Sequence, residues 1–216
     1  GRFIPCLIVS VILQVFSPDT RPEKKEKADI FEILKRKDFW IITVLWLSCA
    51  IASMGIYNII PLYLVKERAI QIESANTIFG ISRIGGFIAM VSMGFLMDRF
   101  KLKRILTVII LSTGLTTIGI ALAHSYLLVS IMLFAQATFA VVFFPAGLVA
   151  ISRLTTLNER SVFTGLLMSI SSPIGSGLSP LILGVVADVW NFQVGILISG
   201  IIITMSYFPL RSLKEI

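Results

Sequence analysis

The chain has 216 residues, of which 56% are hydrophobic and only 14% are charged, and its net charge is +7. Soluble globular chains usually carry about 25% charged residues, so this composition excludes an ordinary soluble domain. The basic residues lie in short clusters between long apolar runs, as they do in the loops of membrane proteins. We therefore predict an all-α integral membrane protein whose surroundings are the lipid bilayer, and we expect no nucleic-acid partner.

The chain opens on an apolar run, Phe3–Phe16, that ends at Ser17-Pro18. A signal peptide would end in a cleavage site of small residues, and none follows this run. We expect residues 1–16 to be the end of a transmembrane helix whose beginning lies upstream. On this interpretation the chain is a fragment of a longer protein.

A charged linker is predicted over residues 17–38. Within it, apolar residues recur at helical spacing opposite charged ones, at Ile30, Phe31, Ile33 and Leu34. This pattern predicts a short amphipathic helix over Ala28–Leu34, lying on the inner membrane surface. A regulatory or partner-binding helix is the alternative.

Six further segments are long enough to cross a bilayer, which takes about 20 apolar residues in a helix. They are Phe39–Val65, Ser74–Met97, Ile105–Ala123, Tyr126–Ile151, Val162–Ala187 and Phe192–Leu210. They predict a six-helix bundle over residues 39–210, followed by a short tail at 211–216.

Basic residues are concentrated in the linker, in every second loop and in the tail, whereas the alternate loops hold only Lys66 and Arg68. The positive-inside rule therefore places the linker and the C-terminus in the cytoplasm. We expect a protein of the plasma membrane, specifically a bacterial inner membrane.

Polar residues in the first and fourth spans are candidates for substrate binding. Tyr57 and Asn58 precede Pro61, and a proline within a span frees a backbone carbonyl and permits a bend. Broken helices that line a cavity are where membrane transporters bind ligands. Gln136 lies in the middle of the fourth span. For each of these residues, a hydrogen bond between helices is the equal alternative.

Arg83 lies near the middle of the second span, between Glu73 and Asp98, and therefore near the bilayer midplane. An arginine at this depth is costly unless it faces a cavity or a partner, so it is a functional candidate. Its planar, permanently charged guanidinium suits an oxyanion or another strongly polar solute. A structural arginine that bonds backbone carbonyls or a buried carboxylate is the alternative.

The second span ends in the sequence GFLMDRFKLKR, which contains Gly94, Asp98, Arg99, Lys103 and Arg104. A small residue lets helices approach closely. An acidic residue one turn later can accept bonds from an arginine or from a helix N-terminus. This pattern predicts a conformational latch between helices on the cytoplasmic side. An ordinary basic loop is the alternative.

Six spans after a charged central loop, with G-x-x-x-D-R-x-x-x-(K/R)-R between the second and third, resemble the C-terminal half of a major facilitator superfamily transporter. The resemblance implies that the spans are helices 7 to 12 of twelve and that the partner is a missing N-terminal six-helix half. It also implies that Asp98 meets an arginine at the cytoplasmic end of the fourth span, and Arg153 occupies that position. Lys101 departs from the family pattern, which usually has glycine there.

No Asp or Glu lies in the middle of a span, so this half has no obvious proton carrier. Either the upstream half supplies one, or the protein is a uniporter or exchanger. Nothing resembles a phosphate-binding glycine loop, a metal-ligand cluster or a nucleophile triad, so we expect no enzyme, cofactor or metal. The fifth span, rich in glycine, serine and proline between Ser171 and Pro180, is interpreted as a gating helix or as a tightly packed one.

These features predict a secondary active or facilitative transporter that moves a small polar or anionic solute by alternating access. In that scheme two six-helix bundles rock around a central site. The competing class is a non-transporting membrane scaffold, sensor or assembly factor that retains the fold.

Overall fold

The computed structural model describes residues 29–213, and all regular secondary structure in this range is helical. Residues 1–28 and 214–216 lie outside the described residues, and with them the predicted end of a preceding helix (1–16), the start of the linker (17–28) and the end of the tail. Six helical stretches are long and apolar enough to cross a membrane: Lys37–Lys66, Ile72–Arg99, Leu102–Leu122, Tyr126–Leu154, Leu157–Val189 and Phe192–Arg211. Each overlaps one predicted span, so the predicted all-α membrane fold is confirmed.

The first and fifth spans each contain a π-helix. The first span consists of α3 (Lys37–Ala50), η1 (Ile51–Ile56) and α4 (Tyr57–Lys66). The fifth consists of α8 (Leu157–Ser172), η2 (Pro173–Leu178) and α9 (Ser179–Val189). Pro173 begins η2, where its missing N–H prevents the regular α-helical hydrogen bond. A π turn widens the helix locally and is frequent at functional sites.

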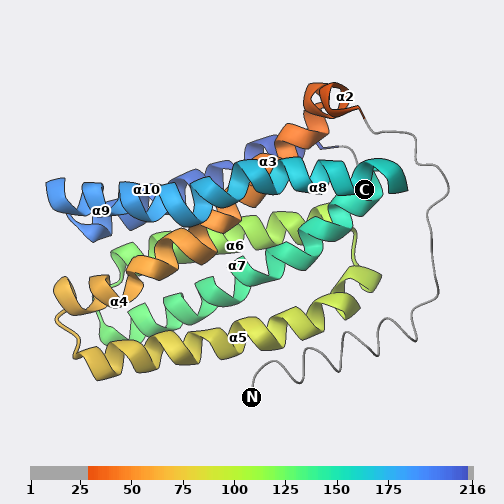
Figure 1. The fold of residues 1–216 in the computed structure, drawn as a ribbon. Helices are drawn as coiled ribbons and strands as arrows, with labels where there is room; N and C mark the ends of the chain where they lie inside the picture. The colour runs from red at the N-terminus through yellow and green to blue at the C-terminus, as the bar shows by residue number, and fades with distance from the viewer. Residues whose placement is uncertain (1–28, 214–216) are drawn as a thin grey trace, which may run out of the picture.

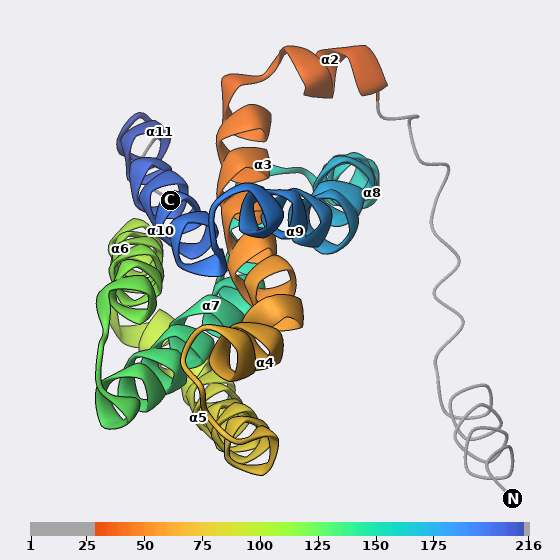
Figure 2. The same cartoon turned by 90° about the vertical axis from the view of Figure 1, so that its left-hand side faces the viewer.

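The other four spans are α5 (Ile72–Arg99), α6 (Leu102–Leu122), α7 (Tyr126–Leu154), and α10 (Phe192–Met205) with α11 (Tyr207–Arg211). Figure 1 shows these helices running side by side along the length of the molecule. Packing is most extensive where α7 meets α5 and α6, and where α6 meets α10. The first span contacts α7, α8, η2 and α10 and so occupies the middle of the bundle, as the end-on view in Figure 2 shows.

Polar caps allow the helices to be joined by short loops. The Ser125 hydroxyl accepts the Leu128 N–H at 3.2 Å at the start of α7. The Asn191 side chain accepts the Val194 N–H at 2.8 Å at the start of α10. At the start of α8, a capping box is formed by Thr156 with Glu159. Each cap satisfies backbone donors that a helix N-terminus leaves open.

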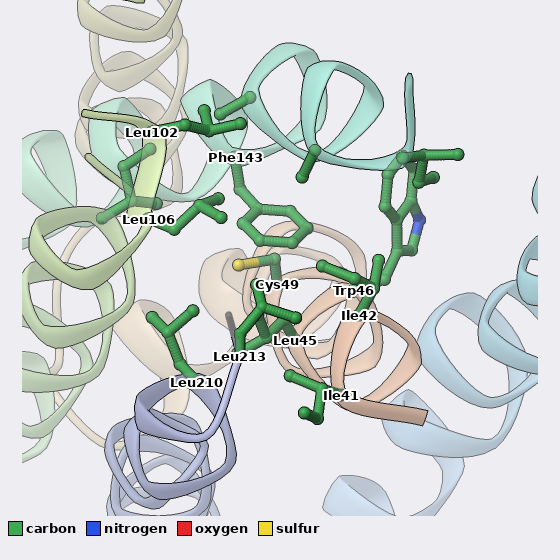
Figure 3. Close-up of a cluster of buried hydrophobic side chains, with 14 of the residues drawn as sticks. Ile41, Ile42, Leu45, Trp46, Cys49, Leu102, Leu106, Phe143, Leu210 and Leu213 are labelled. Atoms are coloured by element: carbon green, nitrogen blue, oxygen red, sulfur yellow. The ribbon is translucent and has the colours of Figure 1, made fainter. Parts of the chain in front are cut away.

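Arg99, Lys103 and Arg104, together with Arg36 and Arg153, mark one end of the bundle, which we call the basic end. One apolar cluster fills the half near this end. Figure 3 shows Cys49 and Trp46 of α3 facing Phe143 of α7 in this cluster. The Trp46 and Phe143 rings meet edge to face with centroids 5.7 Å apart. A second apolar cluster fills the opposite half.

Helix α2 (Ile30–Lys35) overlaps the segment Ala28–Leu34, where the sequence predicts an amphipathic helix, and ends one residue later. Ile33 is buried in the cluster at the basic end and Leu34 packs against it, whereas Ile30 and Phe31 are exposed. The adjacent Arg36 donates to the Leu154 carbonyl at 2.6 Å and pairs with Glu159 at 3.3 Å. These contacts fasten the end of the linker to the turn between α7 and α8. The position of α2 on a membrane surface stays a prediction.

Candidate functional site

A cavity of about 410 Å³ lies between the first span, α5, α7 and η2. Its lining includes Tyr57, Asn58 and Arg83, three of the four residues that the sequence singles out for substrate binding. The other lining residues are Ser53, Met54, Val141, Phe144 and Ser176. The fold thus brings together residues from four separate spans around one space.

Arg83 is placed over two aromatic rings. Its guanidinium carbon lies 4.1 Å from the centroid of the Tyr57 ring and 5.1 Å from that of Phe79. Both distances fall within the range of about 6 Å in which a cation is attracted to a ring face. The side chain is exposed, and no carboxylate or hydrogen-bond acceptor of residues 29–213 binds it. Its N–H donors therefore remain available to a ligand.

Tyr57 supports this arginine. The Tyr57 and Ser82 hydroxyl oxygens lie 3.0 Å apart. Because Ser82 donates its own proton to the Phe79 carbonyl at 2.7 Å, the Tyr57 hydroxyl is the donor in the first bond. The ring is nearly fully buried and joins the first span to α5 directly beside Arg83. Tyr57 therefore orients the guanidinium, and its own hydroxyl is already engaged.

Asn58 follows Tyr57 at the start of α4 and is exposed. Its amide makes no hydrogen bond within the described part of the chain, so both its N–H₂ and its carbonyl are open. Arg83 and Asn58 together offer several donors and one acceptor against an aromatic wall. This set of groups suits a small polar solute that carries an oxyanion.

The two π-helices contribute the remaining polar groups of the cavity. Ser53 belongs to η1 and Ser176 to η2. Each hydroxyl donates to a carbonyl of its own helix at 2.7 Å, Ser53 to Cys49 and Ser176 to Ser172. Their oxygens keep the capacity to accept a hydrogen bond from a solute.

Gln136, the fourth predicted residue, is fully buried on α7 and does not line the cavity. Its Nε2 donates to the Ala52 carbonyl in η1 at 3.1 Å. Its Oε1 has no partner among the described residues. In this structure Gln136 makes the interhelical hydrogen bond that the sequence leaves open as an alternative, and it supports η1.

Sequence reasoning missed five residues of the cavity lining. Ser53, Met54 and Ser176 lie in the π-helices, where the regular 3.6-residue period no longer assigns faces. Gly55 and Pro173 were the available signals for such interruptions. Val141 and Phe144 are apolar residues in an apolar span, and nothing in the sequence separates them from their neighbours.

The residues of the predicted latch lie together at the basic end. Asp98 and Arg153 are both exposed, and no ion pair joins these two described residues. Apart from its chain neighbours and its own helix backbone, no part of the described chain lies within 4 Å of a Cβ built on Gly94. The prediction concerns a contact in one conformational state, and it stays a prediction.

Three basic residues of the latch motif have other surroundings. The Arg99 guanidinium lies 4.2 Å from the centre of the Phe95 ring. Lys103 donates to the Arg211 and Leu213 carbonyls at 3.0 and 2.5 Å and so holds the end of α11. Arg104 lies at the edge of a separate apolar groove.

Two charged residues at the opposite end hold three spans together, and the sequence analysis did not identify either as a structural contact. The Glu67 carboxylate accepts the backbone N–H groups of Phe192 and Gln193 at the start of α10. Arg68 donates to the Ala121 carbonyl near the end of α6 at 2.9 Å. Each charge lies at the helix end whose dipole it complements. The turn after α4 is thereby anchored to α6 and α10.

The sequence model of the Major Facilitator Superfamily matches residues 3–135 and 93–213. Among solved structures, the fold is similar to FucP, a transporter of that superfamily in the outward conformation, with a TM-score of 0.78 and 17% identity over 97% of this chain and 53% of FucP. It is also similar to a bacterial homolog of the human lysosomal transporter Spinster. The inward-facing unoccupied form gives a TM-score of 0.67 and 15% identity over 96% of this chain and 57% of the homolog. The inward-facing occupied form gives a TM-score of 0.63 and 14% identity over 97% of this chain and 56% of the homolog. The chain thus spans little more than half the length of these structures. The comparison with curated proteins found no match.

Proposed function

The chain belongs to the major facilitator superfamily, and on this premise we propose that it forms one half of a transporter for a small polar or anionic solute. The proposed activity is secondary active or facilitative transport. The partner is an N-terminal six-helix half, which supplies the other wall of the central site.

The cavity around Arg83 carries this proposal. The Arg83 guanidinium lies over the Tyr57 ring at 4.1 Å, beside the open amide of Asn58, and within residues 29–213 it has no hydrogen-bond or ion-pair partner. A charge inside a membrane span is costly and is retained where it serves a pathway or a ligand. Solute sites of transporters lie at the bilayer midplane between the two repeats. The exposed positions of Arg83 and Asn58 leave both side chains accessible to a solute held against the partner half.

The same arrangement supports alternating access as the proposed mechanism. Two bundles rock around the bound solute, and the helices that line the site bend or rotate during the cycle. The π-helices η1 and η2 contribute Ser53, Met54 and Ser176 to the cavity, so bending at these segments changes the site directly. Asp98 and Arg153 serve as the latch at the basic end in one of the two states.

The basic end faces the cytoplasm, in accordance with the positive-inside rule. The membrane is the plasma membrane, specifically a bacterial inner membrane. None of the described helices has a carboxylate in the middle of a span. A proton carrier therefore belongs to the partner half, or the protein is a uniporter or exchanger.

The test is solute binding and uptake by the full-length protein, which includes this chain, in proteoliposomes against a panel of carboxylates, phosphate esters and neutral sugars. Arg83→Ala should weaken binding of an anionic solute about tenfold or more, because a hydrogen bond to a charged group contributes about 1.5–3 kcal/mol. Arg83→Lys should restore only part of the affinity, since it keeps the charge and loses the planar fork. Lys37→Ala is the matched control, because it removes the same charge from an exposed residue outside the cavity.

If Arg83→Ala inserts normally into the membrane and binds the solute as the wild type does, Arg83 is not part of the solute site. If saturable uptake of the anionic solute is unchanged in Arg83→Ala, the solute binds elsewhere in the protein. A wild-type protein that neither binds nor transports any member of the panel would favour a non-transporting scaffold, sensor or assembly factor.

A further inference from the structure

An apolar groove of about 460 Å³ lies between α5, α6 and α7, separate from the cavity around Arg83. Its volume is within the range of about 300–1,000 Å³ that is usual for ligand sites. Pairs of apolar residues line it from each helix: Met93 and Leu96, Ile105 and Val108, Phe139 and Val142. Arg104, in the first turn of α6, lies at its edge.

The groove forms because α5 and α7 touch closely in one half of the bundle and diverge toward the basic end, as Figure 1 shows. The close contact is at Gly85, where an added Cβ would lie within 3 Å of Thr138 and Phe134. Beyond this point the two helices leave a space that α6 only partly fills, since α5 and α6 themselves share little contact.

The groove shares no lining residue with the candidate solute site. Ser92 and Leu96 line the groove and follow Arg83 on the same helix. Each residue of an α-helix turns the direction of its side chain by about 100°. Ser92 therefore lies about 180° and Leu96 about 220° around α5 from Arg83. The groove is therefore separate from the solute cavity, and its residues Leu96 and Val108 are exposed.

Arg104 is the charged residue of the lining, and because the wall of the groove exposes only apolar atoms, Arg104 contributes its aliphatic stem to that wall. The two hydroxyls of the lining have no proton left to donate to an anion, since Ser92 donates to the Ile88 carbonyl at 3.0 Å and Thr138 to the Phe134 carbonyl at 2.7 Å. Arg104 is exposed, and no acceptor within residues 29–213 binds its guanidinium. Arg104 lies in the first turn of α6, beside the positive end of the helix dipole. No side-chain cap occupies that helix end. A matching ligand has a long apolar body and one anionic group at its end.

We propose that this groove binds an anionic phospholipid, with an acyl chain along the apolar wall and the phosphate at Arg104. Basic residues at the cytoplasmic end of transmembrane helices attract anionic lipids, and basic pockets between such helices bind their headgroups. The apolar wall matches the acyl chain of an anionic lipid, and the cation Arg104 matches its phosphate. The site is independent of the solute cavity and of the transport proposal.

The test counts bound lipid by native mass spectrometry of the full-length protein in detergent, titrated with phosphatidylglycerol or with zwitterionic phosphatidylcholine. Arg104→Gln should weaken phosphatidylglycerol binding about fivefold and leave phosphatidylcholine binding unchanged. Ser92→Phe should weaken binding of both lipids, because the new ring occupies the groove. Arg211→Gln is the matched control: it removes an exposed guanidinium at the same end of the bundle but outside the groove.

Equal affinity of wild type and Arg104→Gln for phosphatidylglycerol would overturn the proposal. An equal loss in Arg211→Gln would do the same, because it would show a general effect of net charge. Unchanged lipid binding in Ser92→Phe would place the lipid on another surface. Circular dichroism of each variant establishes that its helices are intact.

Discussion

The contact between the two π-helical spans can be tested by one added methyl group. A Cβ built on Gly175 of η2 would lie 2.4 Å from the Ala50 Cβ, 3.2 Å from the Ala50 carbonyl carbon and 3.4 Å from its Cα. Carbon atoms are most stable about 3.5–4.0 Å apart, so Gly175→Ala must separate the two spans by about 1 Å or more. Neither methyl group can escape by rotating, because each is fixed directly to a backbone.

The energetic cost follows from this geometry. Overpacking a well-packed interior costs about 1–3 kcal/mol, and a clash between two backbone-fixed methyl groups belongs at the upper end of that range. Ala50→Gly removes one of the two methyl groups and by itself costs about 1 kcal/mol through helix propensity. The double variant should be more stable than the sum of the single effects predicts, with a coupling of about 1–2 kcal/mol.

The assay is reversible unfolding in mixed micelles, followed by tryptophan fluorescence, for wild type, both single variants and the double variant. Gly165→Ala, in the same span as Gly175, is the control, because no other part of the described chain lies within 4 Å of its added Cβ. It should change stability by less than about 1 kcal/mol. Additive effects of Gly175→Ala and Ala50→Gly would refute the proposed contact between the spans.

Three further predictions use the same unfolding assay. Glu67→Gln should lower the free energy of unfolding by about 1–2 kcal/mol, because it removes the charge that caps α10; an equal loss in Glu73→Gln would contradict this. Arg36→Ala should cost about 1 kcal/mol, since its ion pair is partly solvated, and should raise the rate of proteolysis at the linker; Lys35→Ala should leave that rate unchanged. Gln136→Leu should cost about 1–3 kcal/mol because it removes a buried bond to η1, and a loss of solute affinity with unchanged stability would instead make Gln136 a direct contact.

The fold could be predicted from the sequence because the bilayer imposes simple rules. An uninterrupted apolar run of sufficient length must form a helix, since hydrocarbon offers its backbone no other hydrogen-bond partner. The predicted span boundaries accordingly agree with the structure within a few residues, except at the start of α8. There, the polar first turn from Leu157 to Ser161 is helical because its capping box and Arg160 stabilise it, and hydropathy alone does not detect such contacts.

The candidate site could be predicted only in part. Arg83, Tyr57 and Asn58 were recognisable as candidates because a polar group within a membrane span is costly unless it has a partner, a cavity or a ligand. Whether such a group points into a cavity or into the protein depends on helix rotation, which one sequence does not determine. Gln136 illustrates this limit, since its position in the sequence was equally compatible with ligand binding and with the bond to Ala52 that it makes in this structure.

The π-helix η1 also determines which positions correspond between this chain and its relatives. A π turn accommodates one more residue than an α turn, and one residue corresponds to about 100° of rotation. A relative whose first span is α-helical throughout would present Tyr57 and Asn58 at a different angle unless it also had one residue fewer before them. Alignments of this span therefore need a one-residue gap within Ile51–Ile56 whenever the relative lacks the π turn. Without that gap, the residues assigned to the cavity of the relative would be those that face its lipid or its core.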